Sequence, residues 1–167
     1  MPARFKAALD SGTPDNRVAL IVVDGLALDQ WVTVRQLLQK QDANLVMRES
    51  AVFAWIPTLT SVSRQSIFSG KPPLYFPSTI YSTNSEEKHW KQFWEGYGVS
   101  WLDVAYRRSL GDGDAAKALD AIIHPGKTKA MGLVVDTVDK IMRGGLSPFT
   151  HIVDDLVALF MRNPSAC

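Results

Sequence analysis

Hydrophobic and polar positions along the chain are arranged in blocks that predict strands followed by helices. Residues 18–23 (VALIVV) form a continuous aliphatic run, which is typical of a parallel strand buried on both faces, and we expect this strand to be central in its sheet. Apolar residues then recur at helical spacing over residues 26–41, at Trp31, Val34, Leu37 and Leu38. The chain therefore opens as strand, turn and helix.

The same alternation continues along most of the chain. Residues 45–56 are β-prone as far as Pro57, and residues 62–68 predict a short helix that ends at Gly70. The later predictions are a loop at 74–85, a helix at 86–95, a strand at 99–104, a helix at 112–122, a strand at 131–135 and a helix at 149–161. Strands that alternate with helices predict an α/β fold, a three-layer sandwich with a mostly parallel central sheet flanked by helices.

Composition narrows the classes of function. The 167 residues fit a single domain, 1–167. With 18 Lys and Arg against 17 Asp and Glu, the net charge of +1 provides no global field that would attract nucleic acid or an anionic membrane. The single cysteine, Cys167, excludes an intramolecular disulfide, and no apolar stretch approaches the ~18 residues of a membrane span. We expect a cytoplasmic protein without a membrane or direct nucleic-acid partner.

Carboxylates follow two of the predicted buried strands. Asp24 ends the first strand, and Asp136 and Asp139 follow the strand at 131–135. Because the carboxyl ends of parallel strands meet at one edge of a sheet, these side chains are candidates for a shared divalent cation. The alternative for Asp24 is a structural role, either capping the next helix or forming a turn with Gly25.

Histidine ligands, which zinc sites commonly include, are scarce in this sequence. The candidates are His89, His124 and His151, and none has metal-site spacing to a partner. Each is more typical of a surface or packing residue.

A hydroxyl-rich turn precedes the helix predicted at 62–68. The competing nucleophiles in this turn are Thr58, Thr60, Ser61 and Ser63. An alcohol needs a metal or a base to become a nucleophile near neutral pH, and Arg64 is suited to hold a phosphoryl oxygen. The alternative is that these hydroxyl groups cap the helix while Arg64 is solvated.

Three segments in this order resemble the PglZ domain of phage-defence systems of the BREX and phage-growth-limitation kind, within the alkaline phosphatase superfamily. They are VALIVVDGLALDQW, WIPTLTSVSRQSIFSGKPP and GLVVDTVDKIMRGG. The resemblance covers most of residues 17–145. It implies an alkaline-phosphatase-like fold and a metal-dependent phosphatase or phosphodiesterase activity.

The resemblance also implies roles for individual residues. Asp24 would be a metal ligand, and Thr60 would be both the nucleophile and a metal bridge, because of its place in the Pro-Thr-x-Thr turn. Asp139 would be a further ligand, with Asp136 as its rival, and Arg64 would lie close to the substrate phosphate. The implied cofactor is a divalent metal, with zinc favoured and magnesium or manganese as alternatives.

Two departures from the superfamily pattern affect the second metal site. Arg143 stands where a histidine ligand is usual, and a guanidinium cannot bind a metal. No Asp-His pair follows Gly145, and His151 with its neighbours Asp154 and Asp155 does not restore that pattern. We therefore expect a truncated domain with an incomplete second metal site.

Three hypotheses follow for function. The first is a hydrolase that acts on a phosphoester substrate. The second is a catalytically inactive fragment that binds a metal or the protein partners of a defence assembly. The third is a remnant whose exposed sheet edge makes it a homo-oligomer.

Overall fold

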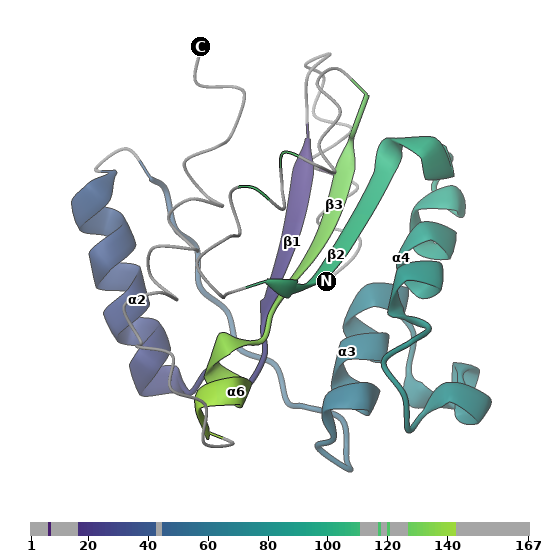
Figure 1. The fold of residues 1–167 in the computed structure, drawn as a ribbon, viewed down its shortest axis with the longest axis horizontal. Coiled ribbons are helices and arrows are strands. Elements are labelled where there is room, and N and C mark those ends of the chain that lie inside the picture. The colour runs from purple at the N-terminus through teal and green to yellow at the C-terminus, as the bar shows by residue number, and fades with distance from the viewer. Residues whose placement is uncertain are drawn as a thin grey trace. The chain divides into compact units, whose positions relative to one another are not determined.

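The computed structural model describes residues 17–42, 45–110 and 127–142, and the single positions 7, 117 and 120. In chain order the elements are β1 (Val18–Val23), α2 (Leu28–Gln41), α3 (Thr60–Ser69), α4 (Glu86–Glu95), β2 (Val104–Leu110), β3 (Ala130–Val135) and α6 (Thr137–Met142) (Figure 1). Short 3-10 turns occupy Pro73–Tyr75, Pro77–Thr79 and Trp101–Asp103.

Several predictions fall on other parts of the chain. The helix predicted at 112–122 lies outside the described residues except at positions 117 and 120, and the helix predicted at 149–161 lies wholly outside them. His124, Arg143 and His151 are also outside. Within the described part, no helix has both the length and the apolar character needed to span a membrane.

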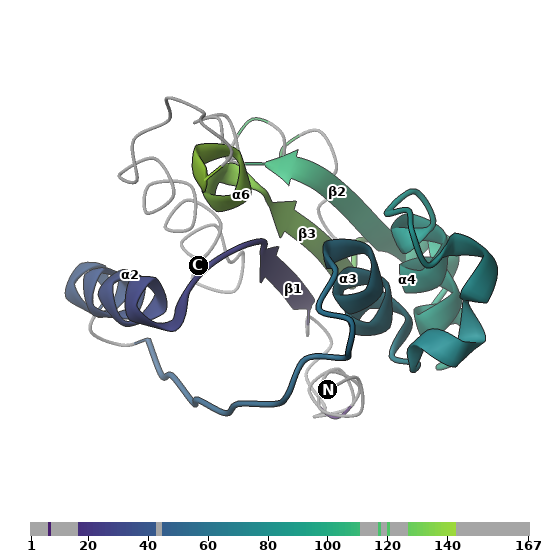
Figure 2. The same cartoon turned by 90° about the horizontal axis from the view of Figure 1, so that it is seen from below.

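The three strands form a parallel sheet in the order β1-β3-β2 (Figure 2). The predicted α/β class is therefore confirmed. The prediction that residues 18–23 are central is wrong for the described sheet, because β3 lies between the other two strands. Burial agrees with this order: five of the six residues of β3 are buried, whereas in β1 only Val18 is.

The chain divides into two compact units, and each strand contributes to both. The first unit contains α3, α4 and the amino-terminal parts of the strands. The second contains α2, α6 and the carboxyl ends of the strands.

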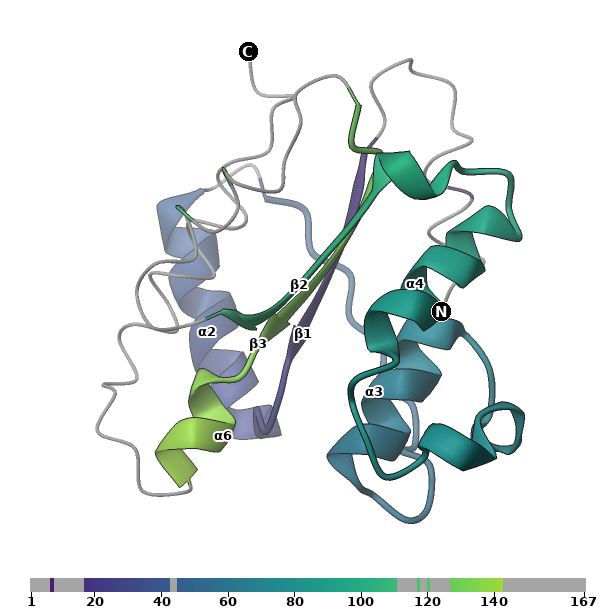
Figure 3. The ribbon, with the colours of Figure 1, turned by 45° about the vertical axis from the view of Figure 1, so that its right-hand side comes forward.

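The first unit has an aromatic core. Helices α3 and α4 lie side by side (Figure 3), and their buried residues include Phe68 and Trp90, whose rings meet edge to face with centroids 5.7 Å apart. The indole nitrogen of Trp90 donates to the carbonyl of Ala105 in β2 at 3.1 Å. A Cβ atom added to Gly132 in β3 would lie 2.9 Å from that nitrogen, so only glycine allows this close approach. Trp90 thus anchors α4 to two strands.

The second unit has an aliphatic core. Its buried residues include Val34, Leu38, Leu110, Val134, Val135 and Val138. Helix α2 confirms the helix predicted at 26–41 and buries two of the four apolar positions that the pattern indicated, Val34 and Leu38, whereas Trp31 and Leu37 are half-buried.

The helices of the first unit agree with the sequence. The helix predicted at 62–68 is confirmed and is longer, because it begins at Thr60, and it ends as expected at Gly70, which has a positive φ of 64°. Helix α4 has the predicted bounds, 86–95.

Two strand predictions are wrong. Residues 45–56 form no strand, and the carboxylate of Glu49 instead accepts hydrogen bonds from Trp31 at 2.9 Å and Arg35 at 2.5 Å, both on α2. The strand predicted at 99–104 begins only at Val104, because the Ser100 side chain accepts a hydrogen bond from the amide of Leu102 and starts a 3-10 turn.

Candidate functional site

Two aspartates occupy matching positions at the carboxyl ends of neighbouring strands. Asp24 directly follows β1, and its amide donates to the carbonyl of Val135 at 2.9 Å. Asp136 directly follows β3, and its amide donates to the carbonyl of Leu110 at 3.1 Å. The sheet therefore brings Asp24 and Asp136 to the same edge, both within the second unit.

The local structure tests the alternative roles of these carboxylates. Asp24 does not cap α2, because the residue before that helix is Ala27, whose amide donates to Oε1 of Gln30 at 2.9 Å. Asp24 and Gly25 form a turn in which Gly25 has a positive φ of 75°. Asp136 immediately precedes α6, a position where aspartate commonly caps a helix, and Asp139 lies in the first turn of α6. The two candidates for the second metal ligand, Asp136 and Asp139, thus lie near the amino end of the same short helix.

The candidate ligands among the described residues are carboxylates, which can serve an oxygen-ligated cation. Among the described residues, no three His, Cys, Asp or Glu side chains are grouped as a metal site. Magnesium keeps several water ligands and is commonly bound by only one or two carboxylates, whereas a structural zinc site needs four protein ligands. A pair of carboxylates therefore fits one hard cation completed by water or substrate oxygens.

His89 is placed as a packing residue. Its ring lies on α4 against Phe76, with centroids 5.5 Å apart. Burial, followed by the positive charges of Lys88 and Lys71, lowers the pKa of His89 below its ordinary value.

The amino end of α3 is suited to an anion. Thr60 is the first residue of this helix, and the residue before it is Leu59, whose apolar side chain cannot cap the helix. The first turn contains no acidic residue, and the first intrahelical bond runs from the Ser63 amide to the Leu59 carbonyl at 2.9 Å. The amides of residues 60–62 precede that bond, so they and the helix dipole favour a bound anion.

Hydrogen bonding separates the competing hydroxyl groups. Ser61 donates to the carbonyl of Ile80 at 2.6 Å. The neighbouring turn is also bound to α3 by the buried Gln65, which makes two hydrogen bonds with Thr79, each at 2.7 Å. Ser61 therefore has a structural role. Thr60 is half-buried at the helix start and makes no side-chain hydrogen bond within the described part of the chain.

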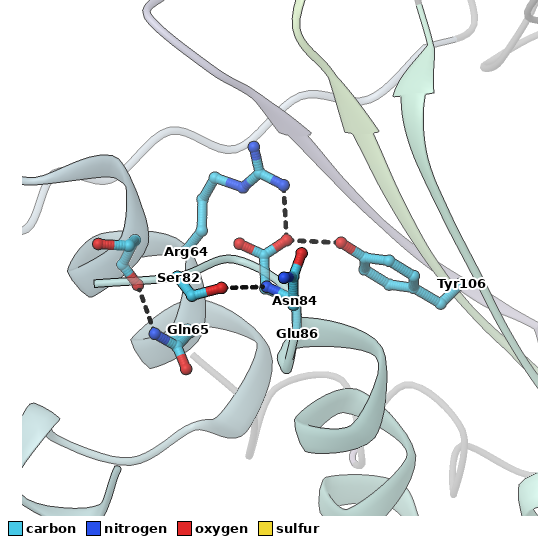
Figure 4. A network of polar contacts seen from close by, with 7 residues as sticks. Arg64, Gln65, Ser82, Asn84, Glu86 and Tyr106 are labelled. Atoms are coloured by element: carbon cyan, nitrogen blue, oxygen red, sulfur yellow. Dashed lines mark hydrogen bonds and ion pairs between the residues drawn. The ribbon is translucent and has the colours of Figure 1, made fainter. Parts of the chain in front are cut away.

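Arg64 is buried and ion-paired. Its side chain lies in α3, is 9% exposed and places Nη2 2.5 Å from Oε2 of Glu86, the first residue of α4. The hydroxyl group of Tyr106 in β2 donates to the same Oε2 at 2.5 Å (Figure 4). The alternative of a solvated Arg64 is therefore wrong.

The polar cluster also affects Tyr106. Burial is the largest cause that raises the pKa of its phenol above the ordinary value, followed by the hydrogen bond to Glu86 and by the negative charge of Glu86. Tyr106 is thus a fixed hydrogen-bond donor across the neutral range.

Residues 4–145 match the family described as the BREX system PglZ alkaline phosphatase-like domain. The chain belongs to this family. No curated protein matches the sequence. The match contains all three segments on which the resemblance was based, so the PglZ assignment made from the sequence is confirmed.

The candidate residues of this PglZ domain divide between its two units. The structure brings Asp24 together with Asp136 in the second unit, whereas Thr60 and Arg64 share α3 in the first. Sequence reasoning missed Glu86 and Tyr106. A glutamate at a helix start is ordinarily exposed, and Tyr106 lies 20 residues further along the chain, so neither residue gave a signal before the fold was known.

Proposed function

We propose that this PglZ domain is a metal-dependent phosphoric-ester hydrolase, a phosphatase or phosphodiesterase, of a phage-defence system. The observation that carries the proposal is the amino end of α3, where Thr60 stands at the first position, the capping residue is apolar and Arg64 follows one turn later. This arrangement suits a phosphoryl group.

The carboxylates at the sheet edge are the proposed metal ligands. Asp24 would hold a divalent cation together with Asp136 or Asp139, with zinc as the expected cation and magnesium or manganese as the alternatives. A bound cation would supply charge neutralisation and would lower the pKa of a coordinated alcohol or water. Asp24 would orient that cation from the turn after β1.

The reaction we propose proceeds in two displacements. The oxygen of Thr60 forms a bond to phosphorus, the bond from phosphorus to the leaving alcohol breaks, and the proton of Thr60 passes to solvent while the alcohol takes one. The oxygen of a water molecule then forms a bond to phosphorus, the bond from phosphorus to the Thr60 oxygen breaks and that oxygen takes up a proton, and phosphate leaves, or a phosphomonoester if the substrate is a diester. Throughout, the amides at the start of α3 and the Arg64 guanidinium would stabilise the negative oxygens.

A second candidate function is a non-catalytic module that binds a cation or a protein of the defence assembly. One observation favours it. Large apolar side chains are exposed along residues 52–56, among them Phe53 and Ile56, and exposed apolar surface is typical of protein contacts.

Hydrolysis of nitrophenyl phosphate monoesters and diesters with magnesium, manganese or zinc tests the proposal. We expect metal-dependent turnover that Thr60→Ala abolishes, whereas Thr58→Ala, the matched loss of a threonine hydroxyl two residues earlier, retains it. Turnover that survives in Thr60→Ala would exclude the covalent mechanism. No turnover with any of the cations would favour the non-catalytic module.

A further inference from the structure

The cluster of Arg64, Glu86 and Tyr106 contains a buried ion pair, between Arg64 and Glu86, and a half-buried tyrosine. Glu86 is fully buried, and its Oε1 has no hydrogen-bond partner among the described residues. Withdrawing a carboxylate from water is opposed by a large desolvation penalty, and a buried ion pair commonly stabilises a protein no more than apolar residues of the same volume would. The cluster is better explained by the geometry that it fixes.

The cluster fixes the side chain of Arg64 on the face of α3 that also carries Thr60. Arg64 follows Thr60 by four residues, so the two side chains share one helix face, and helical side chains point toward the amino end of the helix. That end is where the proposed substrate phosphate binds. The position of the Arg64 guanidinium therefore decides whether it can reach a phosphoryl oxygen.

Two further elements determine that position. Glu86 extends from the first turn of α4, where the helix dipole favours its negative charge. Tyr106 extends from β2 and donates to the same oxygen, Oε2, that Arg64 contacts (Figure 4). Two donors from different elements therefore converge on one carboxylate oxygen, which restricts where that oxygen and the guanidinium bound to it can lie.

We infer that Glu86 and Tyr106 are positioning residues, which hold Arg64 where it receives a phosphoryl oxygen of the substrate. Neither residue touches the substrate. The inference rests on the proposed function, because it takes the phosphate to bind at the amino end of α3.

The first test is Tyr106→Phe in the full chain. This change removes the hydroxyl donor and keeps the ring, which packs edge to face on Phe68 with centroids 5.2 Å apart, so the fold is retained. We expect the Kd for inorganic phosphate, measured by calorimetry, and the KM for nitrophenyl phosphate to rise about five- to tenfold, the range of one hydrogen bond to a charged group. The kcat should change little, because a contact made equally in ground and transition states affects KM.

Two further variants separate positioning from stability. Glu86→Gln keeps an acceptor near Arg64 but removes the charge, and we expect a larger rise in the phosphate Kd than in Tyr106→Phe. Thr79→Val is the matched control, because it deletes a 2.7 Å hydrogen bond to the buried Gln65 in the same unit without touching the cluster. It should lower the Tm and leave the phosphate Kd unchanged.

The outcomes distinguish this inference from the proposed function. A lower Tm with an unchanged phosphate Kd in both Tyr106→Phe and Glu86→Gln would reduce the cluster to a structural ion pair and overturn the inference. Absence of phosphate binding by the unmodified chain would also overturn it, even if turnover were observed. Phosphate binding without turnover would remove the hydrolase proposal, and the comparison of Kd values would still decide the role of Glu86 and Tyr106.

Discussion

Asp24 and Asp136 end the neighbouring parallel strands β1 and β3, and the amide of Asp24 is bonded to the carbonyl of the residue that precedes Asp136. If they share a divalent cation, that cation binds only the folded chain. A concentration about a hundredfold above its Kd should raise the Tm by about 5 to 10 °C. Thermal unfolding with magnesium, manganese and zinc measures this shift.

Variants of the carboxylates assign the ligands. We expect Asp24→Asn and Asp136→Asn each to remove the shift, while Asp29→Asn, an aspartate in the first turn of α2, retains it. If the metal-dependent rise in Tm disappears in Asp139→Asn but persists in Asp136→Asn, the second ligand is Asp139 in α6. An unchanged shift in Asp24→Asn would exclude Asp24.

The contact between Gly132 and Trp90 gives a prediction about the first unit. The methyl group of Gly132→Ala would meet Trp90 Nε1 at 2.9 Å and Phe68 Cε1 at 3.0 Å. Because both rings are buried and packed against each other, we expect a loss of about 1–3 kcal/mol in the free energy of unfolding, measured with urea.

A double-mutant cycle assigns that loss to the ring. Trp90→Phe shortens the ring system and should make Gly132→Ala less destabilising than it is in the original chain. Equal losses in the two backgrounds would show that the indole is not the obstacle.

The elements that the sequence predicted best are those set by a single local signal in the sequence. The aliphatic run of β1, the apolar stripe of α2 and the stop at Gly70 each act locally, and each is found in the structure. The same reasoning wrongly predicted a strand from the apolar residues near Trp101, because the Ser100 hydroxyl accepts a hydrogen bond that starts a 3-10 turn there. It also placed β1 at the centre of the sheet, since periodicity reports burial but not the order of strands.

The candidate site was predictable only in part. The positions of Asp24 at a strand end and of Thr60 at a helix start were predicted correctly, because both boundaries are visible in the sequence, and their roles stay predictions. The partners of Arg64 were not, because Glu86 lies 22 residues away from it and is brought there by packing of α4 on α3. The assignment of ligands between Asp136 and Asp139 depends on side-chain geometry that no spacing rule determines.

Tyr106 predicts a loss of stability in alkaline solution. Its pKa is raised in the folded chain, so above about pH 10, where an ordinary tyrosine ionises, the unfolded chain loses a proton that the folded chain keeps. The free energy of unfolding should therefore fall as the pH rises above about 10. Urea unfolding at several pH values should show a shallower fall in Tyr106→Phe than in the original chain, and equal slopes would contradict the assignment.

His89 predicts a loss of stability in acidic solution. Burial chiefly, and then the charges of Lys88 and Lys71, lower the pKa of His89, so below about pH 6.5 the unfolded chain takes up a proton that the folded chain resists. Stability should therefore decrease as the pH falls through this range, and His89→Gln should flatten that decrease. A proton NMR titration should give His89 a midpoint below the ordinary value. Because burial is the larger cause, Lys88→Gln should raise the midpoint only slightly, and a return to the ordinary value in that variant would show that charge rather than burial controls this imidazole.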